Sequence, residues 1–583
     1  MQLVGNIRAL VGKLPKALIT VEANRSLERM KRCRKVQRRL LKELLWMHRE
    51  SHFAHAYKLD RMSTIDNFRK YFPVTNFEDY RPYIEQLKKG NLRALLGANS
   101  KLLMFSLSSG TTSESKFIPI TDRFLKDYRR GWRNWGVRVL NEHKPVCTRS
   151  IVQLTSDYDK FRTPGGTPCG NISGLVAAMQ LKIVRAMYTI PSIVSKIESP
   201  EKKTYTALRL ALTDSEVAML TTANPSTLIH WTRFAESHAE DLIRDIHDGT
   251  LSVELDHTVQ RELDRKVSRP EPVRARRLHK IFERHGTLVP KEVWPNLSVL
   301  AVWTGGSAGA FLPKLHELFG DIPVRDHGLS ASEGRMTIPV EDGIAPGILD
   351  VESHYFEFIP AEEYETSNPT ILEAHELEAG QDYYILLTTS SGFYRYDICD
   401  VVRCTGFHGS TPMLRFLHKG AHISNVTGEK ITEFQAVEAI DNAKRRLGLS
   451  FEYFTLAPTW SDPPFYHVVS EELADGDHRA SRSVAEQFAA EVDRELQRLN
   501  CEYKEKRESG RLENVRWHCI PHAAWLQFSR TRQMNVGGSF EQYKHPCLSP
   551  SLTFLDELQK AATEIKVREK NIIRLQTTGR AAS

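Results

Sequence analysis

Apolar positions near the start of the chain recur at three- and four-residue spacing. Over residues 26–48 this pattern predicts one amphipathic helix, because residues so spaced share a helical face. The apolar positions are Leu27, Met30, Val36, Leu40, Leu41, Leu44 and Leu45. Arginine and lysine crowd the other positions, among them Arg32, Arg34, Arg38 and Arg39. Such a helix more commonly packs on its own domain with the basic face in solvent; contact with nucleic acid or an anionic membrane is the alternative.

Two apolar runs farther along the chain predict buried strands. The first covers residues 150–156, and the second covers residues 297–306 and ends in a glycine turn. Helical patterns dominate over residues 175–285, and another follows over residues 311–319. This alternation of strand and helix predicts a mostly parallel α/β sheet, in which ligands gather at the loops beyond the strand ends.

The sequence becomes rich in β-branched and aromatic residues over positions 355–416, which predicts a small antiparallel sheet or barrel. After a turn-rich stretch at 415–430, the strand patterns FEYFTLAP, FYHVVS and VRWHCI accompany a helical pattern over residues 484–499. The expected fold class is therefore α/β. A large N-terminal domain, residues 1–417, contains α/β sheets and a small β-barrel-like part, and a smaller C-terminal α+β domain covers residues 418–583.

Composition places the chain among ordinary folded proteins. Its 583 residues include 80 basic and 72 acidic ones, and the net charge of +8 is small for this length. The eight cysteines form no C-x-x-C pair, so neither a zinc site nor a disulfide framework is indicated. The N-terminus makes a poor secretory signal, and no uncharged run is long enough to span a membrane. A cytoplasmic enzyme or binding protein is the simplest expectation.

The stretch FSLSSGTTSESKFIPIT, residues 105–121, has the composition of an anion-binding loop. Gly110 permits a sharp turn, the surrounding serine and threonine hydroxyls can join backbone amides around phosphate oxygens, and Lys116 adds a positive charge. A Walker A loop fits poorly, because Ser115 and Phe117 occupy the places of its second glycine and its Ser/Thr. A solvent-exposed Ser/Thr linker is the alternative.

Four motifs in this order resemble the Gretchen Hagen 3 auxin-responsive family of acyl-acid amido synthetases, a branch of the adenylate-forming superfamily that includes acyl-CoA synthetases and firefly luciferase. They are SSGTTSESKFIP (108–119), SASEGRMTIPV (330–340), YRYDICDVVRCTGFHGSTP (394–412), and SNVTGEKITE with EQYKHP (424–433 and 541–546). The resemblance covers nearly the whole chain. It implies a large adenylate-forming domain, followed by a mobile C-terminal domain.

The resemblance also implies roles for individual residues in binding ATP and Mg²⁺. The phosphate loop would use Ser108, Ser109, Gly110, Thr111, Thr112 and Lys116. In this loop Glu114 departs from the family's usual glycine, and its carboxylate would repel the phosphates unless it points away from them or faces Mg²⁺. Glu333 would bind Mg²⁺, with Ser332, Thr304 and Gly305 shaping the nucleotide site. The alternative for Glu333 is that it caps a following helix.

Three further residues acquire implied roles. Asp400 would accept the ribose hydroxyls, although Asp397 and Cys399 replace the family's usual arginine and glycine beside it. A surface aspartate in a turn is the alternative. Lys544 resembles the C-terminal lysine that enters the site during adenylation, and Lys419 lies where the family has a basic residue near its hinge.

The function implied is that of an ATP-dependent ligase, which adenylates a carboxylic acid and transfers the acyl group to an amine, in particular an amino acid. The expected partners are these small molecules, with no nucleic acid and no integral membrane segment; the oligomeric state stays open. A carboxylate–CoA ligase and a noncatalytic nucleotide-binding relative remain alternatives. A basic-helix adaptor for nucleic acid or membranes is a further one, and predicts salt-sensitive binding.

Overall fold

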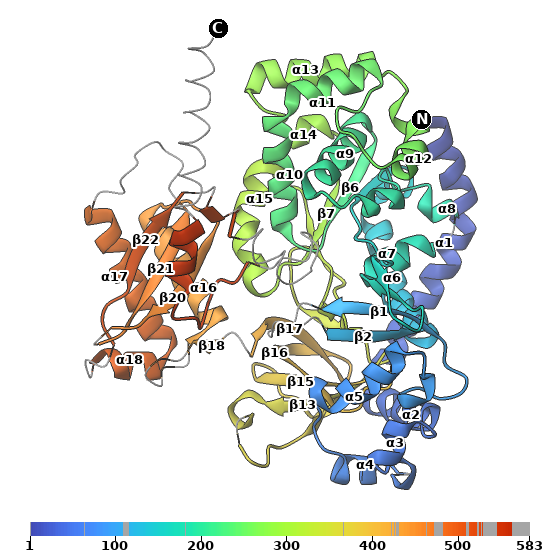
Figure 1. Ribbon diagram of the computed structural model, residues 1–583, viewed down its shortest axis with the longest axis vertical. Helices are drawn as coiled ribbons and strands as arrows, with labels where there is room; N and C mark the ends of the chain where they lie inside the picture. The colour runs from blue at the N-terminus through green and yellow to red at the C-terminus, as the bar shows by residue number, and fades with distance from the viewer. Residues whose placement is uncertain are drawn as a thin grey trace. The chain divides into compact units, whose positions relative to one another are not determined.

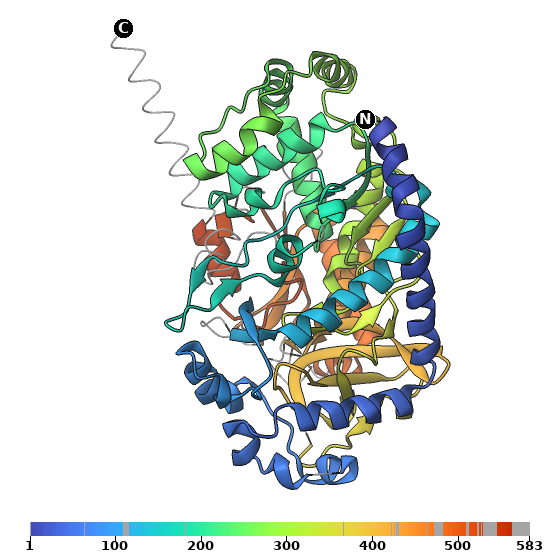
Figure 2. The same cartoon turned by 90° about the vertical axis from the view of Figure 1, so that its right-hand side faces the viewer.

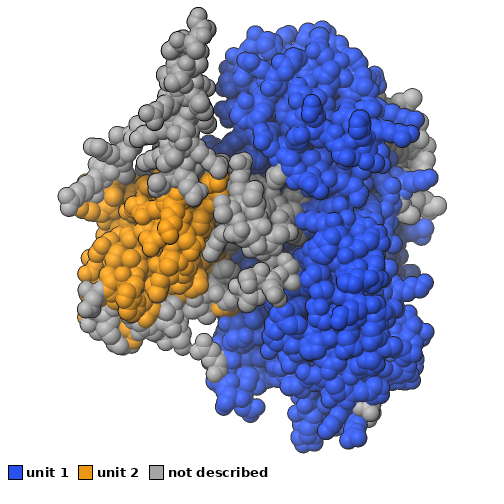
Figure 3. All heavy atoms as spheres, viewed as in Figure 1, with its two compact units in different colours: residues 1–308, 312–416 blue, residues 309–311, 417–583 orange. Residues whose placement is uncertain are grey.

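The computed structural model divides the chain into two compact units (Figure 3). Unit 1 comprises Met1–Ala308 and Leu312–Phe416, and unit 2 comprises Gly309–Phe311 and Leu417–Ser583. The residues that the structure describes are 2–62, 64–108, 116–180, 182–364, 366–420, 423–424, 426, 429, 431–461, 463–471, 482–508, 512–521, 524–525, 527–528 and 545–561.

Helices form the N-terminal part of unit 1, and α1 lies beside α6 in both ribbon views (Figures 1 and 2). The helices here are α1 (Gln2–Met30), α2 (Cys33–Met47), α3 (His52–Ala56), α4 (Ile65–Tyr71), α5 (Phe77–Lys88) and the short η1 (Leu59–Arg61) and η2 (Leu92–Ala94). The single helix expected over residues 26–48 is wrong, because the chain breaks between Met30 and Cys33. Ser410 explains the break: its Oγ accepts from the Cys33 amide at 3.0 Å and donates to the Lys31 carbonyl at 2.9 Å. None of the described helices is long and apolar enough to cross a membrane.

A four-stranded parallel sheet lies in the middle of unit 1, which confirms the expected α/β architecture. Its order is β3 (Ser150–Gln153), β6 (Val217–Thr221), β7 (Val299–Val302) and β8 (Val324–Asp326). Helices dominate residues 175–285 as expected, but the expectation did not include strand β6. All five residues of that strand are buried, and periodicity cannot distinguish so short an apolar run from a buried helical segment.

Helices and short 3₁₀ segments precede and connect these strands (Figure 1). They are α6 (Asp122–Glu142), η3 (Lys144–Cys147), α7 (Ile172–Ala178), α8 (Lys182–Arg185), η4 (Ser192–Lys196), α9 (Pro200–Thr213), α10 (Pro225–Ser237), α11 (Ala239–Asp248), α12 (His257–Val267), α13 (Pro272–His285), α14 (Pro290–Val293), η5 (Gly306–Phe311) and α15 (Leu312–Phe319). A second sheet of unit 1 has the order β2 (Lys116–Thr121), β1 (Leu102–Ser108), β5 (Pro168–Gly170) and β4 (Phe161–Arg162).

The antiparallel sheet expected over residues 355–416 is confirmed. Seven strands have the order β11 (Thr337–Ile338), β12 (Gly347–Leu349), β17 (Thr411–Lys419), β16 (Tyr396–His408), β15 (Asp382–Thr388), β13 (Tyr355–Pro360) and β14 (Leu372–Glu373). The short η6 (Ala361–Glu363) and η7 (Ala374–Glu376) lie in its loops, and β9 (Ser330–Ala331) and β10 (Gly334–Arg335) form a separate hairpin before it. The apolar side chains of β13, β15 and β16 join those of α2 and α5 in one core.

Unit 2 is the α+β structure that the sequence predicts. Strands β20 (Phe454–Thr459) and β21 (Phe465–Glu471) pair antiparallel, and β22 (Arg516–Ile520) pairs parallel with β21. The other described elements are β18 (Ile423–Ser424), β19 (Ile431–Thr432), α16 (Glu433–Leu447), α17 (Arg482–Leu499) and α18 (Cys501–Glu508). Apolar residues of α16, α17, β20 and β21 form a core of its own.

Candidate active site

The carboxyl ends of the parallel strands gather polar side chains at one edge of the sheet. Strand β6 ends at Thr221, β7 runs into Thr304, and β8 ends at Asp326, which is followed by His327. Thr221 Oγ1 lies 3.0 Å from His327 Nε2, so the ends of β6 and β8 are linked directly. In open α/β sheets ligands bind at this edge, and two residues predicted for the nucleotide site, Thr304 and Gly305, lie there.

Asp326 holds the turn that contains Thr304. One carboxylate oxygen accepts hydrogen bonds from the Thr304 amide and hydroxyl, both at 2.6 Å, and the other accepts from the Gly328 amide at 2.5 Å. Burial raises the pKa of Asp326, and these hydrogen bonds oppose the rise. Sequence reasoning missed Asp326, although an acidic residue directly after a buried parallel strand was a usable signal.

Two aromatic rings, those of Trp135 and His327, pack beside Asp326 at this edge of the sheet. Trp135 donates its Nε1 hydrogen to the Asp326 carbonyl at 2.7 Å, and the His327 ring packs edge-on against Trp132 and Trp135. Burial lowers the pKa of His327 to about 3, so the imidazole is neutral at physiological pH. His327 therefore serves as a hydrogen-bonding group here and adds no charge.

Glu333 lies in the turn between β9 and β10. Ala331 pairs with Gly334 and Ser330 with Arg335, which leaves Ser332 and Glu333 as the two turn residues. The alternative that Glu333 caps a helix is therefore wrong. Its side chain is only 7% exposed, and burial together with the nearby Glu333 carboxylate raises the pKa of Tyr396 on β16. Glu333 thus lies beside the strand that carries Asp400.

Asp400 lies in a bulge of β16. Opposite it, β15 advances by two residues from Tyr384 to Leu386, while β16 advances by four from Asp397 to Val401. The extra residues break the usual alternation, and Asp400 is buried at 3% exposure next to buried Val401. The alternative that Asp400 is a surface aspartate in a turn is therefore wrong.

The two departures beside Asp400 have structural explanations. Cys399 has a φ of 57°, the left-handed conformation that glycine adopts most easily, so the backbone keeps the shape that the family's glycine would favour. Asp397 accepts a hydrogen bond from the Cys399 amide at 2.7 Å and another from the Tyr364 hydroxyl at 2.6 Å. The replacement residues therefore help to fix the bulge.

The phosphate-loop prediction is only partly covered by the described residues. Strands β1 and β2 pair so that Ser108 lies opposite Lys116, and the Lys116 ammonium lies 5.5 Å from the centre of the Phe77 ring. Lys419 is the last residue of β17. The remaining predicted residues, Ser109, Gly110, Thr111, Thr112 and Lys544, and also Glu114, lie outside the described residues.

Two fully buried arginines, Arg395 directly before β16 and Arg335 on β10, differ in their hydrogen-bond partners. Arg395 binds both oxygens of Glu357, at 2.8 and 2.7 Å, and donates to the Arg69 carbonyl at 3.1 Å. Arg335, beside Glu333 on β10, stacks its guanidinium 4.1 Å from the centre of the Trp132 ring. None of the described residues accepts a hydrogen bond from the three guanidinium nitrogens of Arg335.

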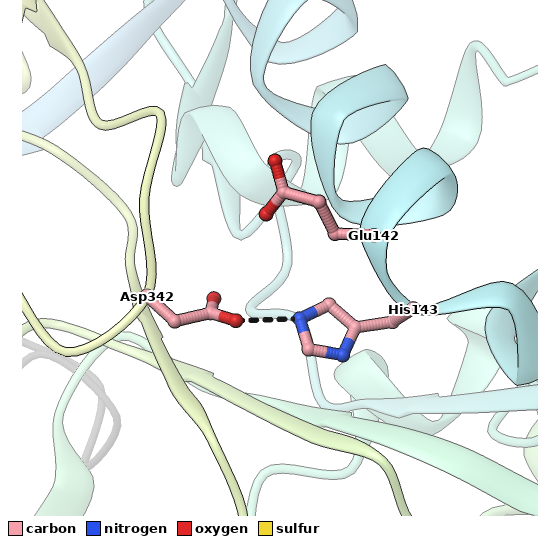
Figure 4. A group of neighbouring side chains, drawn as sticks. All are labelled: Glu142, His143 and Asp342. Carbon is pink, nitrogen blue, oxygen red and sulfur yellow. Dashed lines mark hydrogen bonds and ion pairs between the residues drawn. The ribbon is translucent and has the colours of Figure 1, made fainter.

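A separate group of three side chains has the composition of a metal site (Figure 4). His143 Nε2 lies 2.8 Å from an oxygen of Asp342, and Glu142 lies next to it at the end of α6. Both carboxylates, however, bind the completely buried guanidinium of Arg325, which is 2.6 Å from Asp342 and also pairs with Glu142. We interpret this group as an ion-pair network that fixes β8, the strand that carries Asp326.

Most of the sequence matches models of one protein family. The GH3 family N-terminal domain matches residues 23–324, the GH3 family central domain matches residues 347–419, and the GH3 family C-terminal domain matches residues 434–552. The chain belongs to the GH3 family. This confirms the resemblance that the four motifs indicate.

Known GH3 proteins resemble the chain along most of their length. Indole-3-acetic acid-amido synthetase GH3.2 of Arabidopsis thaliana is 24% identical over 500 residues, which cover 81% of this chain and 90% of that protein. Jasmonoyl-L-amino acid synthetase JAR6 of Nicotiana attenuata is 24% identical over 538 residues, covering 88% and 91%. The structure of GH3.15 acyl acid amido synthetase superposes with a TM-score of 0.79 at 21% identity over 92% of this chain and 94% of that one. This likeness establishes a shared GH3 fold.

Proposed function

We propose that this GH3 protein is an ATP-dependent ligase that adenylates a carboxylic acid and then transfers the acyl group to an amine. The observation that carries the proposal is that all three GH3 domains match in order between residues 23 and 552. The similar proteins GH3.2 and JAR6 are named as amido synthetases, so the proposed product is an amide. An amino acid is the proposed amine, since JAR6 is named for such a product.

The proposed reaction needs two steps, because a free carboxylate is anionic and lacks an adequate leaving group. In the first step a carboxylate oxygen attacks the α-phosphate of ATP, which releases pyrophosphate and leaves an acyl-adenylate. In the second step the amine attacks the acyl carbon, AMP leaves, and the amine loses a proton. Developing negative charge in the first step must be stabilised by groups that are already in position.

Residues of unit 1 supply the proposed ATP site. The hydroxyls and amides of residues 108–112 and the ammonium of Lys116 bind the phosphates, and Asp400 accepts the ribose hydroxyls. The turn of Thr304 and Gly305 forms a rigid wall, because Asp326 fixes Thr304 through two hydrogen bonds of 2.6 Å. A fixed turn needs no rearrangement when the nucleotide binds.

Glu333 is the proposed Mg²⁺ ligand. Its carboxylate is 7% exposed, projects from a two-residue hairpin turn and offers the oxygen donors that Mg²⁺ prefers. Mg²⁺, when bound, neutralises phosphate charge. Lys544 is the proposed source of additional positive charge during adenylation, and rotation of the C-terminal domain near Lys419 would withdraw it before the amine enters.

Acid-dependent exchange of labelled pyrophosphate into ATP tests the first step. We expect exchange with at least one acid of a broad carboxylate panel, and no exchange with any acid would contradict the proposal. The Lys544→Ala variant should slow exchange at least tenfold, while amide formation from a preformed acyl-adenylate should be nearly unchanged. The matched control is Lys504→Ala, which removes a 56%-exposed lysine of the same unit and should alter neither step.

The acceptor is tested by offering amino acids and coenzyme A to the preformed adenylate and measuring AMP together with the acyl product by mass spectrometry. Amide formation supports the proposal. AMP release with a thiol and with no amine would instead indicate a carboxylate–CoA ligase. ATP binding without pyrophosphate exchange would indicate a noncatalytic relative.

A further inference from the structure

The excess positive charge of the protein is concentrated at the junction of α1 and α2. Residues 25–42 contain nine arginines and lysines and one acidic residue, Glu28, which gives this segment a net charge of +8. The whole chain of 583 residues also has a net charge of +8, so the remaining residues sum to zero. A charge imbalance confined to 18 residues is an electrostatic feature of one surface rather than of the whole protein.

The structure arranges these charges as a stripe along α2. Exposed residues recur at intervals of three and four at Arg32, Lys35, Arg39, Lys42 and Trp46, and this spacing keeps them on one face of the helix. Among the described residues, Arg32, Lys35 and Lys42 make no ion pair. We call these five residues, together with the exposed Arg34 next to Lys35 in the sequence, the α2 stripe.

The opposite face of α2 is fixed to unit 1. Leu40, Leu41 and Leu44 are buried in the core. Gln37 donates to the carbonyls of Val351 and His354, both at 2.7 Å. The helix, drawn in dark blue in Figures 1 and 2, therefore cannot turn its apolar face outward without losing this packing. Any partner of the stripe is held by charge and not by insertion of the helix.

Two basic residues of α2, Arg38 beside the stripe and Arg39 within it, already pair with carboxylates, which leaves fewer cations available to a partner. Arg38 pairs with Glu373 at 3.0 Å, and Arg39 pairs with Glu43 at 3.2 Å. Arg38 is therefore partly buried and tied to Glu373 of unit 1, although the sequence groups it with its basic neighbours. Within the α2 stripe, the exposed cations for which the described residues give no acidic partner are Arg32, Arg34, Lys35 and Lys42.

From this geometry we propose that the α2 stripe is a docking surface for an anionic phospholipid membrane. A bilayer rich in acidic headgroups presents the negative charge that complements the stripe. Trp46, at one end of the stripe, is 64% exposed and lies under the Arg49 guanidinium, 4.3 Å from its ring centre. An exposed indole next to cations suits the headgroup level of a membrane.

The same surface is poorly equipped to recognise nucleic-acid sequence. Reading base edges relies on amide and other polar side chains in addition to cations. Gln37 is the one amide side chain in residues 25–49, and its hydrogen bonds to Val351 and His354 occupy it in the interior. The exposed face of α2 offers cations and an indole. These groups favour a ligand whose surface is densely negative and which need not be recognised by base sequence.

Co-sedimentation of the full chain with vesicles tests this proposal. At low ionic strength the protein should bind phosphatidylcholine vesicles that contain phosphatidylserine and should not bind phosphatidylcholine alone. Raised salt should abolish binding, because exposed charges are screened. The variant Arg32→Gln, Arg34→Gln, Lys35→Gln, Lys42→Gln should bind roughly a hundredfold or more weakly, since each cation near an anionic surface contributes roughly a fivefold factor.

A charge-matched control separates the stripe from a general effect of net charge. Arg261, Arg265, Arg276 and Arg277 are exposed on α12 and α13, and their replacement by glutamine removes the same four charges elsewhere. This control should bind vesicles like the parent protein. Both variants should keep the parent's unfolding temperature and pyrophosphate exchange, because neither touches the proposed ATP site.

Several outcomes would overturn the proposal. These are absence of binding to the phosphatidylserine vesicles, equal binding to phosphatidylcholine alone, and equal weakening by the control variant. Displacement from the vesicles by a short RNA or DNA duplex at matched phosphate concentration would identify nucleic acid as the better ligand and would equally contradict it. Since the α2 stripe lies apart from the residues assigned to ATP, loss of vesicle binding leaves the proposed ligase function untouched.

Discussion

The two buried arginines of unit 1 show how differently a fold can treat the same charge. The Arg395 side chain is 2% exposed and faces a fully buried carboxylate, Glu357, in a two-pronged pair. Arg335 is 1% exposed, yet its nearest described acidic neighbours do not hydrogen-bond to it. Both oxygens of the neighbouring buried carboxyl of Asp350 also lack hydrogen bonds among the described residues.

The missing hydrogen bonds around Arg335 and Asp350 are accompanied by shifted pKa values. Burial lowers the pKa of Arg335 to about 10 and raises the pKa of Asp350 to about 6. Burial penalises the charged form of either group, and only well-directed hydrogen bonds offset that penalty. Arg395 and Glu357 thus form a fixed structural link, whereas the Arg335 region keeps a carboxyl that titrates close to neutral pH.

The largest expected effect comes from breaking the matched pair. Glu357→Gln leaves the Arg395 guanidinium buried without its counter-charge, and we expect it to lower the free energy of unfolding by about 3–5 kcal/mol. Urea unfolding measures the loss. The control is Glu78→Gln, which removes a 67%-exposed partner of Arg81 and should change stability by less than about 0.5 kcal/mol. Equal losses in the two variants would contradict the contrast.

The second prediction uses the raised pKa of Asp350. A carboxyl whose pKa is higher in the folded state stabilises the protein below its unfolded pKa, and this stabilisation disappears as pH rises through about 6. Arg130 and Arg335 oppose the rise, and Glu352 and Asp127 add to it. Between pH of about 4 and 7 the stability of the parent relative to Asp350→Asn should fall by roughly 2 kcal/mol.

The free energy of unfolding of the parent and of Asp350→Asn is measured across this pH range, and one value is subtracted from the other. The titration of all other groups, which the two proteins share, cancels in this difference. A difference that does not vary with pH would show that the pKa of Asp350 is the same in the folded and unfolded states. A difference that grows with pH would show that its pKa is lowered, which would place it in the same class as a matched ion pair.

The third prediction tests how closely α6 approaches this region. A Cβ atom at Gly131 would lie 2.9 Å from Arg335 Cδ and 3.1 Å from an oxygen of Asp350, so Gly131→Ala forces buried polar groups apart. We expect a net loss of about 1–2 kcal/mol despite the better helix propensity of alanine. Gly136 lies on the same helix with nothing within 4 Å of its Cβ position, so Gly136→Ala should instead stabilise by up to about 1 kcal/mol. The same sign in both variants would refute the close approach.

How well the sequence predicted these features depends on how local their causes are. Periodicity and turn residues were enough for the parallel sheet, the antiparallel sheet and the α+β unit, because those signals lie within each segment. The break between α1 and α2 depends on Ser410, which lies more than 370 residues farther along the chain. Strand β6 was missed because five buried residues carry no periodicity of their own.

The candidate site shows the same limit. Motif spacing singled out Glu333 and Asp400, but not the hairpin turn of the first or the bulge of the second, since both depend on pairing between strands. Asp326 was missed because it belongs to none of the four motifs. Its importance follows from Thr304, which only the folded sheet brings within 2.6 Å. Local sequence therefore identified candidate site residues, while the pairing of strands in the folded protein determined their positions and contacts.

The smallest expected effect concerns Cys399 on β16, the strand that begins directly after Arg395. Arg395 and Cys399 both have left-handed backbones, with φ values of 44° and 57°, but Arg395 is held there by its bonds to Glu357 and to backbone carbonyls. A left-handed conformation costs roughly 1–2 kcal/mol for a residue with a Cβ. Glycine removes that strain at an entropic cost of roughly 0.5–1 kcal/mol. Cys399→Gly should therefore raise the free energy of unfolding by about 0.5–1 kcal/mol.

Cys399→Ala is the matched control, because it removes the thiol and keeps the Cβ. If backbone strain is the cause, alanine should give no gain, and pyrophosphate exchange should continue in the glycine variant because Asp397 and Asp400 are unchanged. A gain with alanine equal to that with glycine would assign the effect to the thiol in its place beside Tyr364. A loss with glycine alone would mean that the Cys399 side chain stabilises the bulge more than its backbone strains it, as the Arg395 side chain does four residues earlier.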